Sequence, residues 1–232
     1  MGEGSMPLLP RLAIGRRAMA AGLAAGATIA PALLLPRHAL AGIPASRRLA
    51  FDVTRNAKPI GTHVLTFGPA GPNFDVVIQV DIIVRWAGLV LYRYSLRGSE
   101  TWQNGALVSA QAETNDDGTR QTMRATRRDG RLVVEGTHGP TYVAPERSIV
   151  ASHWNPAQLD ARMIDIQDGE LLDLKIAPRG KGIIAAHGSQ VEADQFSLSG
   201  KVAIELWYDR ERVWSKLSAT SWDGSVIEYR RT

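Results

Sequence analysis

Five Asn-Gly or Asp-Gly pairs punctuate the chain, and they limit its possible folds more than any other feature. They stand at residues 104–105, 117–118, 129–130, 168–169 and 223–224, each between segments that resemble strands. These dipeptides tolerate the positive φ angles that tight hairpin turns require. The spacing therefore predicts an antiparallel β-meander, in which consecutive strands are neighbours in the sheet.

The segments between the turns alternate apolar and polar residues with a period of two, which is typical of half-buried strands. The longest alternation covers residues 74–84, and a turn near Ala87-Gly88 leads into a second long strand. We expect a core that includes Phe74, Val76, Ile78, Val80, Val90, Tyr92, Leu206 and Tyr208.

One segment, residues 152–156, fits neither strand nor hairpin. Asn155 is a good helix N-cap, and Pro156 suits the first helical position because its missing N–H would have no partner there. Gln158, three residues after the cap, completes a weak capping box. The sequence predicts one short helix after Asn155 in an otherwise all-β chain.

The C-terminal strands, residues 202–209 and 212–220, form the most regular hairpin. A tight loop at Arg210-Glu211 would place Trp207 opposite Trp214, a favourable cross-strand pair. Leu206 and Tyr208 then occupy the other face, so both faces carry apolar bulk. We expect the second face to be covered by the short helix, by a fold-over of the same sheet, or by a ligand. The fold class expected is all-β, with a single strongly curved antiparallel sheet forming an incomplete barrel or wrapped meander.

The N-terminus resembles an export signal. Arg16-Arg17 precede an apolar run that ends in a small-x-small site at residues 39–41. The paired arginines favour the twin-arginine route, with cleavage after Ala41, a periplasmic location and one β-rich domain over residues 42–232. The alternative, a retained membrane anchor, is opposed by Pro31 and Pro36. Four arginines and one glutamate fall in this segment, so most of the net charge of +4 belongs to it. The sequence therefore gives no reason to expect a nucleic-acid partner.

Several chemistries are disfavoured by the residues present. The chain has no cysteine, which excludes disulfides, thiolate catalysis and iron–sulfur clusters. The histidines of the expected mature chain lie far apart, and no His-Glu-x-x-His motif occurs, so we predict no metal site and no cofactor. No phosphate loop and no Gly-x-Ser-x-Gly elbow is present. The four histidines of the expected mature chain are His63, His138, His153 and His187.

Five short motifs, taken together and in order, carry a resemblance to a known family. They begin with residues 51–53 and 59–61, and continue with Thr114-Asn115-Asp116-Asp117-Gly118. His153-Trp154-Asn155-Pro156, Leu206-Trp207-Tyr208-Asp209 and Ile227-Glu228-Tyr229-Arg230 follow. Over about residues 49–232 the chain resembles an uncharacterised family of exported bacterial β-rich proteins, a domain of unknown function. That family is distantly similar to curved-sheet periplasmic proteins of the lipoprotein-carrier type. The resemblance implies a fold and supplies no catalytic residues.

Three functions are compatible with this sequence. The first is a non-enzymatic periplasmic binding or carrier protein for an apolar or lipid-like ligand, with Trp154, Trp207 and Trp214 as candidate walls of its site. The second is an envelope-modifying enzyme or accessory factor centred on His153, with Asp160 or Glu146 as an acidic partner. The third is a structural or interaction module that pairs with a protein partner through an exposed strand edge.

Overall fold

The computed structural model describes residues 42–232, and the expected signal segment with its cleavage site after Ala41 lies outside them. The described chain is almost entirely strand, with one 3₁₀ helix. The first strands are β1 (Arg48–Arg55), β2 (Lys58–Phe67), β3 (Asn73–Trp86), β4 (Leu89–Gln103), β5 (Ala106–Asp116), β6 (Thr119–Arg128), β7 (Arg131–Gly136) and β8 (Gly139–Val143). An inner segment follows with β9 (Ser148–Val150), the helix η2 (Pro156–Asp160), β10 (Arg162–Ile164) and β11 (Leu171–Leu172). The last strands are β12 (Leu174–Ala186), β13 (Ser189–Gly200), β14 (Ala203–Asp209), β15 (Trp214–Thr220) and β16 (Val226–Arg231).

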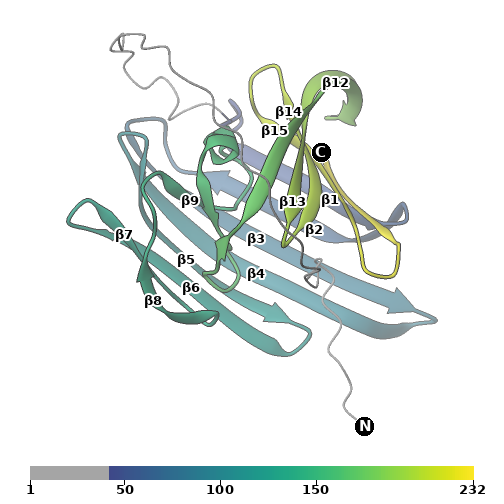
Figure 1. The fold of residues 1–232 in the computed structure, drawn as a ribbon. Helices are drawn as coiled ribbons and strands as arrows, with labels where there is room; N and C mark the ends of the chain where they lie inside the picture. Colours follow the sequence, from purple (N-terminus) through teal and green to yellow (C-terminus); the bar gives the residue numbers. More distant parts are fainter. Residues whose placement is uncertain (1–41) are drawn as a thin grey trace, which may run out of the picture.

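Thirteen strands form one antiparallel sheet in the order β12-β13-β14-β15-β16-β1-β2-β3-β4-β5-β6-β7-β8. The chain runs from the centre of the sheet to the β8 edge, crosses through the inner segment, and returns from the β12 edge. Consequently β16 pairs with β1 in the middle of the sheet, with Val53 opposite Tyr229. The sheet curves strongly and does not close, since β12 and β8 remain its two edges (Figure 1). The expected all-β, curved and incomplete barrel is confirmed.

The inner face of the sheet carries the core, as the alternation predicts. In β3, every second residue from Phe74 to Val84 is buried, while Asp75, Gln79 and Asp81 face outward. The small sheet β11-β10-β9 and η2 lie on the concave side and fill much of it (Figure 1). Their contribution to the core includes Trp154, Met163 and Ile164, all nearly inaccessible to solvent. Burial of such side chains contributes about 1.5–3 kcal/mol each.

The inner layer, which consists of residues 148–172, lies very close to the sheet at Gly136, the last residue of β7. A Cβ added there would lie 2.1 Å from the carbonyl oxygen of Asp168. That carbonyl accepts a hydrogen bond from the backbone N–H of His138 at 3.1 Å. The absence of a side chain at residue 136 therefore allows the loop after β10 to bond directly to the sheet.

The predicted hairpin turns are present. Asn104, Asp117 and Asp129 have φ angles of 48–50°, and each precedes a glycine that also has positive φ. They join β4 to β5, β5 to β6 and β6 to β7. Asp168-Gly169 lies instead in the inner layer between β10 and β11.

The prediction that Val90 belongs to the core is wrong, because its side chain is 42% exposed. The register between β3 and β4 shifts at Val84/Arg85, so that Val84 opposes Tyr92 while Arg85 opposes Val90. A β-bulge of this kind reverses the facing of residues beyond it. The other seven predicted core residues are buried.

The predicted pairing of Trp207 with Trp214 is also wrong. A register shift at Trp207/Tyr208 places Trp207 opposite Lys216 and Tyr208 opposite Trp214. The ammonium of Lys216 lies 5.0 Å from the centre of the Trp207 ring. Trp207 packs with Ile184 and Ala193 in a separate small cluster. These residues belong to β12 and β13, so a fold-over of the same sheet covers the second apolar face.

The helix after Asn155 is confirmed, but the capping box is not formed. The Asn155 side chain accepts a hydrogen bond from the backbone N–H of Ala157 at 3.0 Å, and Pro156 opens the helix. The side-chain amide of Gln158 turns away from the cap and bonds to the Tyr208 hydroxyl and the His153 carbonyl. Burial of Gln158 among tertiary partners outweighs the local capping geometry.

The two sheet edges differ in their protection. The β12 edge carries Lys175, Arg179 and Lys181, and its register shifts between Pro178 and Gly180. Charged side chains and bulges on an edge oppose pairing with another chain. The β8 edge is short, with Pro140 inside it. Within residues 42–232 no helix has the length and apolarity needed to span a membrane.

Candidate functional site

A cavity of about 120 Å³ remains between the inner layer and the sheet. It is comparable to engineered apolar cavities that accept benzene or xenon. Its wall comes from β2, β3 and β4 on one side and from β12 to β16 on the other, with the inner layer as its cover. The apolar lining includes Ile78, Val80, Leu96, Met163, Leu198, Ile204 and Leu217. The polar lining consists of His63, Tyr94, Ser152, His153, Asp165, Gln167 and Tyr229.

His63 and His153 meet at this cavity although 90 positions separate them in the chain. Both rings contact the indole of Trp214 edge-on, at centroid distances of 5.3 and 5.5 Å. Burial and the neighbouring His153 lower the pKa of His63 to about 3. Burial lowers the pKa of His153 to about 4, against the opposing effect of a hydrogen bond with Gln158. Both histidines are therefore neutral at physiological pH.

Two polar atoms at the cavity lack a hydrogen-bond partner among the described residues. They are Nε2 of His63, a residue that is only 7% exposed, and Nδ1 of His153. Leaving such a buried group unpaired costs about 1–3 kcal/mol. A ligand with a hydrogen-bonding group at one end would recover this energy.

The half-buried residues Ile166, Gln167, Leu174 and Val202 mark where the cavity approaches the surface. They belong to the loop after β10, the start of β12 and the turn between β13 and β14. An apolar molecule would enter the cavity between these segments.

Of the site residues proposed from the sequence, which are His153, Trp154, Trp207 and Trp214, only His153 lines the cavity. Its backbone has a φ of 67°, and its carbonyl accepts a hydrogen bond from the Tyr208 hydroxyl at 2.8 Å. The suggested acidic partners Glu146 and Asp160 are exposed, and neither affects the pKa of His153. The structure therefore brings His153 to His63 and not to Glu146 or Asp160.

The three candidate tryptophans are not brought together around one site, and none lines the cavity. Trp154 is fully buried among Phe67, Phe74 and Trp102. Trp214 packs behind the two cavity histidines. Trp207 lies on the opposite face of the sheet.

Trp154 also takes part in a buried polar cluster. Oε2 of Glu100 accepts hydrogen bonds from the indole N–H groups of Trp102 at 2.7 Å and Trp154 at 3.0 Å. Burial raises the pKa of Glu100, and hydrogen bonds from Ser152 and the two indoles partly oppose this. The cluster ties the inner layer to β4.

A second group of polar side chains lies together in the structure and was not predicted from the sequence. A ring nitrogen of His138 and carboxylate oxygens of Asp168 and Glu170 lie within 4.8 Å of one another, close enough to bind one metal ion. They lie in a groove beside Tyr142. The ammonium of Lys201 contacts Glu170 and supplies positive charge there. Thirty residues separate His138 from the two acids, so no local spacing could have indicated the cluster.

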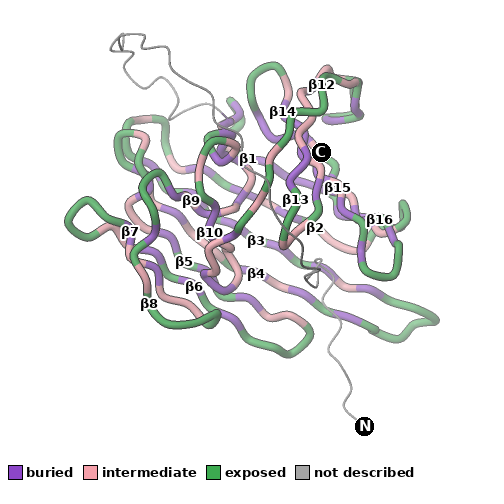
Figure 2. The backbone as a smooth tube through the Cα atoms, in the orientation of Figure 1, coloured by how far each residue is buried: buried purple, intermediate pink, exposed green. Residues whose placement is uncertain are grey.

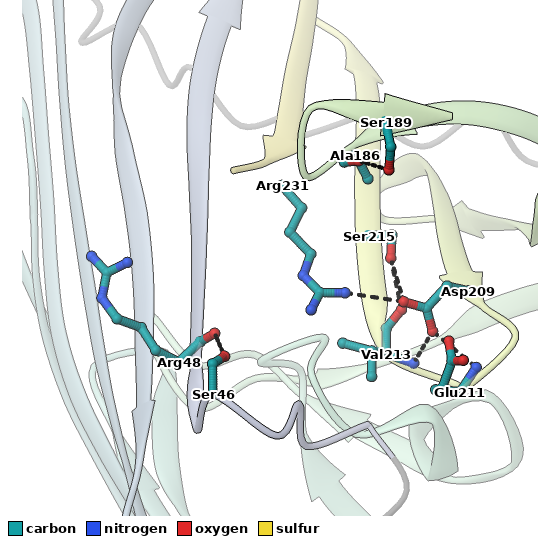
Figure 3. Close-up of polar contacts among 9 residues, drawn as sticks. All are labelled: Ser46, Arg48, Ala186, Ser189, Asp209, Glu211, Val213, Ser215 and Arg231. Carbon is teal, nitrogen blue, oxygen red and sulfur yellow. Dashed lines mark hydrogen bonds and ion pairs between the residues drawn. The ribbon is translucent and has the colours of Figure 1, made fainter. Parts of the chain in front are cut away.

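A third polar group lies in a groove of about 690 Å³ near the C-terminus. Arg231, which is 7% exposed, bonds to Asp209 at 3.0 Å, and Asp209 also accepts from the Ser215 hydroxyl and the Val213 backbone (Figure 3). Asp209 thus has four donors, since the backbone N–H of Glu211 also bonds to it. The arrangement joins β14 to β16 across β15 and is a structural ion pair.

Comparison with solved structures supports the fold. The chain is similar to a β-barrel-like protein of the domain of unknown function DUF1849 from Brucella abortus, with 8% sequence identity and a TM-score of 0.56. The similarity covers 80% of this chain and 95% of that one. At this identity the likeness extends to the fold alone.

Comparison at the level of sequence gives a family and no activity. No curated protein matches the chain. The profile of DUF6134, a domain of unknown function, matches residues 51–232, which include β1 to β16 apart from the first residues of β1. This chain belongs to the DUF6134 family.

Proposed function

We propose that the protein is an exported binding protein that holds a small apolar ligand, or the apolar end of a lipid-like one, in the cavity beneath its inner layer. The observation that supports this most directly is an apolar cavity with two unpartnered ring nitrogens, Nε2 of His63 and Nδ1 of His153. Ligand sites of this kind are largely apolar, with a few polar groups that fix orientation.

The volume sets the size of the bound group. A cavity of about 120 Å³ holds a small ring or a short alkyl segment and not a whole diacyl lipid. A longer ligand would therefore extend past Leu174 and Val202 into solvent. Neutral histidines do not attract an anion, so a hydroxyl or carbonyl head suits the polar end better than a phosphate.

Two small probes test whether the cavity binds an alkyl chain and whether its polar end binds a hydroxyl. 1-Hexanol and hexane share the alkyl chain and differ in the hydroxyl. Both should raise the melting temperature, and hexanol should raise it more, because its hydroxyl can pair with His63. At a probe concentration of 100 Kd the gain in stability is about 2.7 kcal/mol.

A His63→Leu variant provides the matched control. It should keep the response to hexane and reduce the additional response to hexanol, for which only His153 then offers a free ring nitrogen. No stabilisation by either probe, or an advantage of hexanol that is undiminished in the variant, would contradict the proposal.

Export is tested separately. We propose that the chain reaches the periplasm by the twin-arginine route and loses residues 1–41. Intact mass of the periplasmic protein should correspond to a chain that begins at Gly42. Replacing Arg16-Arg17 with two lysines should leave the full-length chain in the cytoplasm. Export of that variant at an unchanged level would exclude the route.

A further inference from the structure

The hairpin formed by β3 and β4 extends beyond the rest of the sheet. On one side, the pairing of β2 with β3 ends at Gly61 opposite Ile82. On the other, the pairing of β4 with β5 ends at Tyr94 opposite Asp116. Residues 84–92 pair only with each other in the sheet, and the hairpin projects from one end of the molecule (Figure 1). The strands end at Trp86 and Leu89, four and five residues past these pairs, so at about 3.3 Å per residue the turn lies roughly 15 Å beyond them.

This projecting tip is apolar and exposed. Trp86 is 69% exposed, Leu89 65%, Leu91 50% and Val90 42%. The bulge at Val84/Arg85 turns Val90 away from the core, so that large side chains cover the tip on both faces. Exposure of four large apolar side chains on nine residues indicates an interaction site.

A second exposed tryptophan lies at the same end of the sheet. Trp222, 66% exposed, is in the turn between β15 and β16, and Val226 follows it. In an antiparallel sheet the turns after β1, β3, β5 and β15 lie at one end. Figure 2 shows the tips of the β3–β4 and β15–β16 hairpins as exposed segments on one side of the molecule.

The charges on the tip are all positive. Residues 83–93 include Arg85 and Arg93, both exposed, and no acid. The acids at this end of the sheet include Asp116 and Asp117, at the level of Arg93, and Asp223, which follows Trp222 and pairs with Arg55. Tryptophan with flanking arginine is typical of protein segments located at the boundary between lipid headgroups and acyl chains.

We propose that this end of the sheet docks on an anionic lipid bilayer, with the β3–β4 tip inserted among the headgroups and Trp222 as a second contact. Two separate apolar tips suit a fluid surface better than a protein partner, because a protein interface has a contiguous, well-packed core. The arginines then meet the anionic headgroups, each contributing about a fivefold gain in binding. The inference does not depend on the ligand proposal.

Vesicle flotation tests the docking. The protein, with its N-terminus established by intact mass, is mixed with vesicles of phosphatidylcholine alone or of phosphatidylcholine and phosphatidylglycerol in equal parts. It should float with the anionic vesicles, and tryptophan emission should shift to shorter wavelength. The variant Trp86→Ser/Leu89→Ser/Leu91→Ser should bind both vesicle types at least tenfold more weakly. Arg85→Gln/Arg93→Gln should lose about 25-fold on anionic vesicles only.

The control variant Val77→Ser/Ile183→Ser removes exposed apolar side chains away from the tip, and its binding should match that of the unaltered protein. Every variant shares the same N-terminus, so any contribution of that segment cancels. Equal flotation of the tip and control variants would overturn the proposal. A second result would also overturn it: the unaltered protein does not bind vesicles and forms a dimer by light scattering, and the tip variant abolishes that dimer. The tip would then be a contact with a second copy of the chain.

Discussion

The indole N–H of Trp154 lies 3.0 Å from Oε2 of Glu100, a residue 54 positions earlier in the chain. The same oxygen accepts the indole N–H of Trp102 at 2.7 Å. One buried carboxyl thus joins the inner layer, which covers the cavity, to the sheet beneath it.

Replacing Glu100 with Leu should destabilise the protein by about 2–4 kcal/mol, because two buried indole N–H groups lose their acceptor. Glu100→Gln keeps an oxygen in place and should retain most of the stability. Urea unfolding at pH 7 measures both. Equal losses in the two variants would show that the carboxyl oxygen does not hold the cluster.

The same residue should give a defined pH effect. Burial raises the folded-state pKa of Glu100, so the folded protein binds this proton more tightly than the unfolded chain. The unaltered protein therefore loses stability as pH rises from about 4.5 through the folded pKa. The stability of Glu100→Gln relative to the unaltered protein should rise between pH 4 and pH 7. A difference that stays constant or falls would contradict the assignment.

The cavity histidine His63 should have the opposite pH dependence. Its folded-state pKa is lowered from 6.5 to about 3, so the unfolded chain takes up the proton first as pH falls. Its contribution is fully present above pH 6.5 and is lost progressively below it, by about 2 kcal/mol at pH 5. His63→Leu should flatten this part of the stability curve. An equal slope in the variant and in the unaltered protein would exclude a buried neutral His63.

Much of the fold could be predicted from the sequence because its signals are local. The alternation in β3 and the turn dipeptides Asn104-Gly105 and Asp117-Gly118 each depend on a few neighbouring residues. The bulges in the β3–β4 and β14–β15 pairings could not be predicted, because sheet twist and packing decide where an extra residue enters. For that reason Val90 and the Trp207–Trp214 pair were misplaced.

The site was less accessible to prediction than the fold. His153 stood out because it precedes a tryptophan and a helix cap. Its partner His63 is an ordinary residue of an alternating strand, and only the return of the sheet through β16 and β15 brings Trp214 against both rings. The buried acid Glu100 likewise lies in a strand with no local sign of burial.

Gly136→Ala should destabilise the contact between the inner layer and β7. The added Cβ would lie 2.1 Å from the Asp168 carbonyl oxygen, so the loop must move away, at a cost of about 1–3 kcal/mol. Gly139→Ala is a matched control nearby, since a Cβ there meets nothing within 4 Å. Thermal unfolding should show a loss for Gly136→Ala alone. Equal melting temperatures would show that the close approach is not maintained in solution.

The ion pair between Arg231 and Asp209 should contribute more than an exposed one. Asp209→Asn leaves the largely buried guanidinium of Arg231 without its counter-charge, and we expect a loss of about 2–4 kcal/mol. Asp81→Asn breaks the pair with Arg97, whose partners are about half exposed, and should cost less than about 1 kcal/mol. Urea unfolding of both variants makes the comparison, and a reversed order would contradict it.

The most direct test of the binding proposal is native mass spectrometry of the protein purified gently from its producing cells, followed by organic extraction. Three variants accompany it: Val80→Phe, which fills the cavity; Val202→Trp, at its rim; and Val226→Phe, a control of the same volume change at an exposed site. Melting temperatures identify any variant that does not fold. We expect a stoichiometric apolar compound on the unaltered protein and on Val226→Phe. The amount bound should be reduced or zero in the two cavity variants. A clean apo mass for the unaltered protein, or equal retention in folded cavity variants, would contradict it.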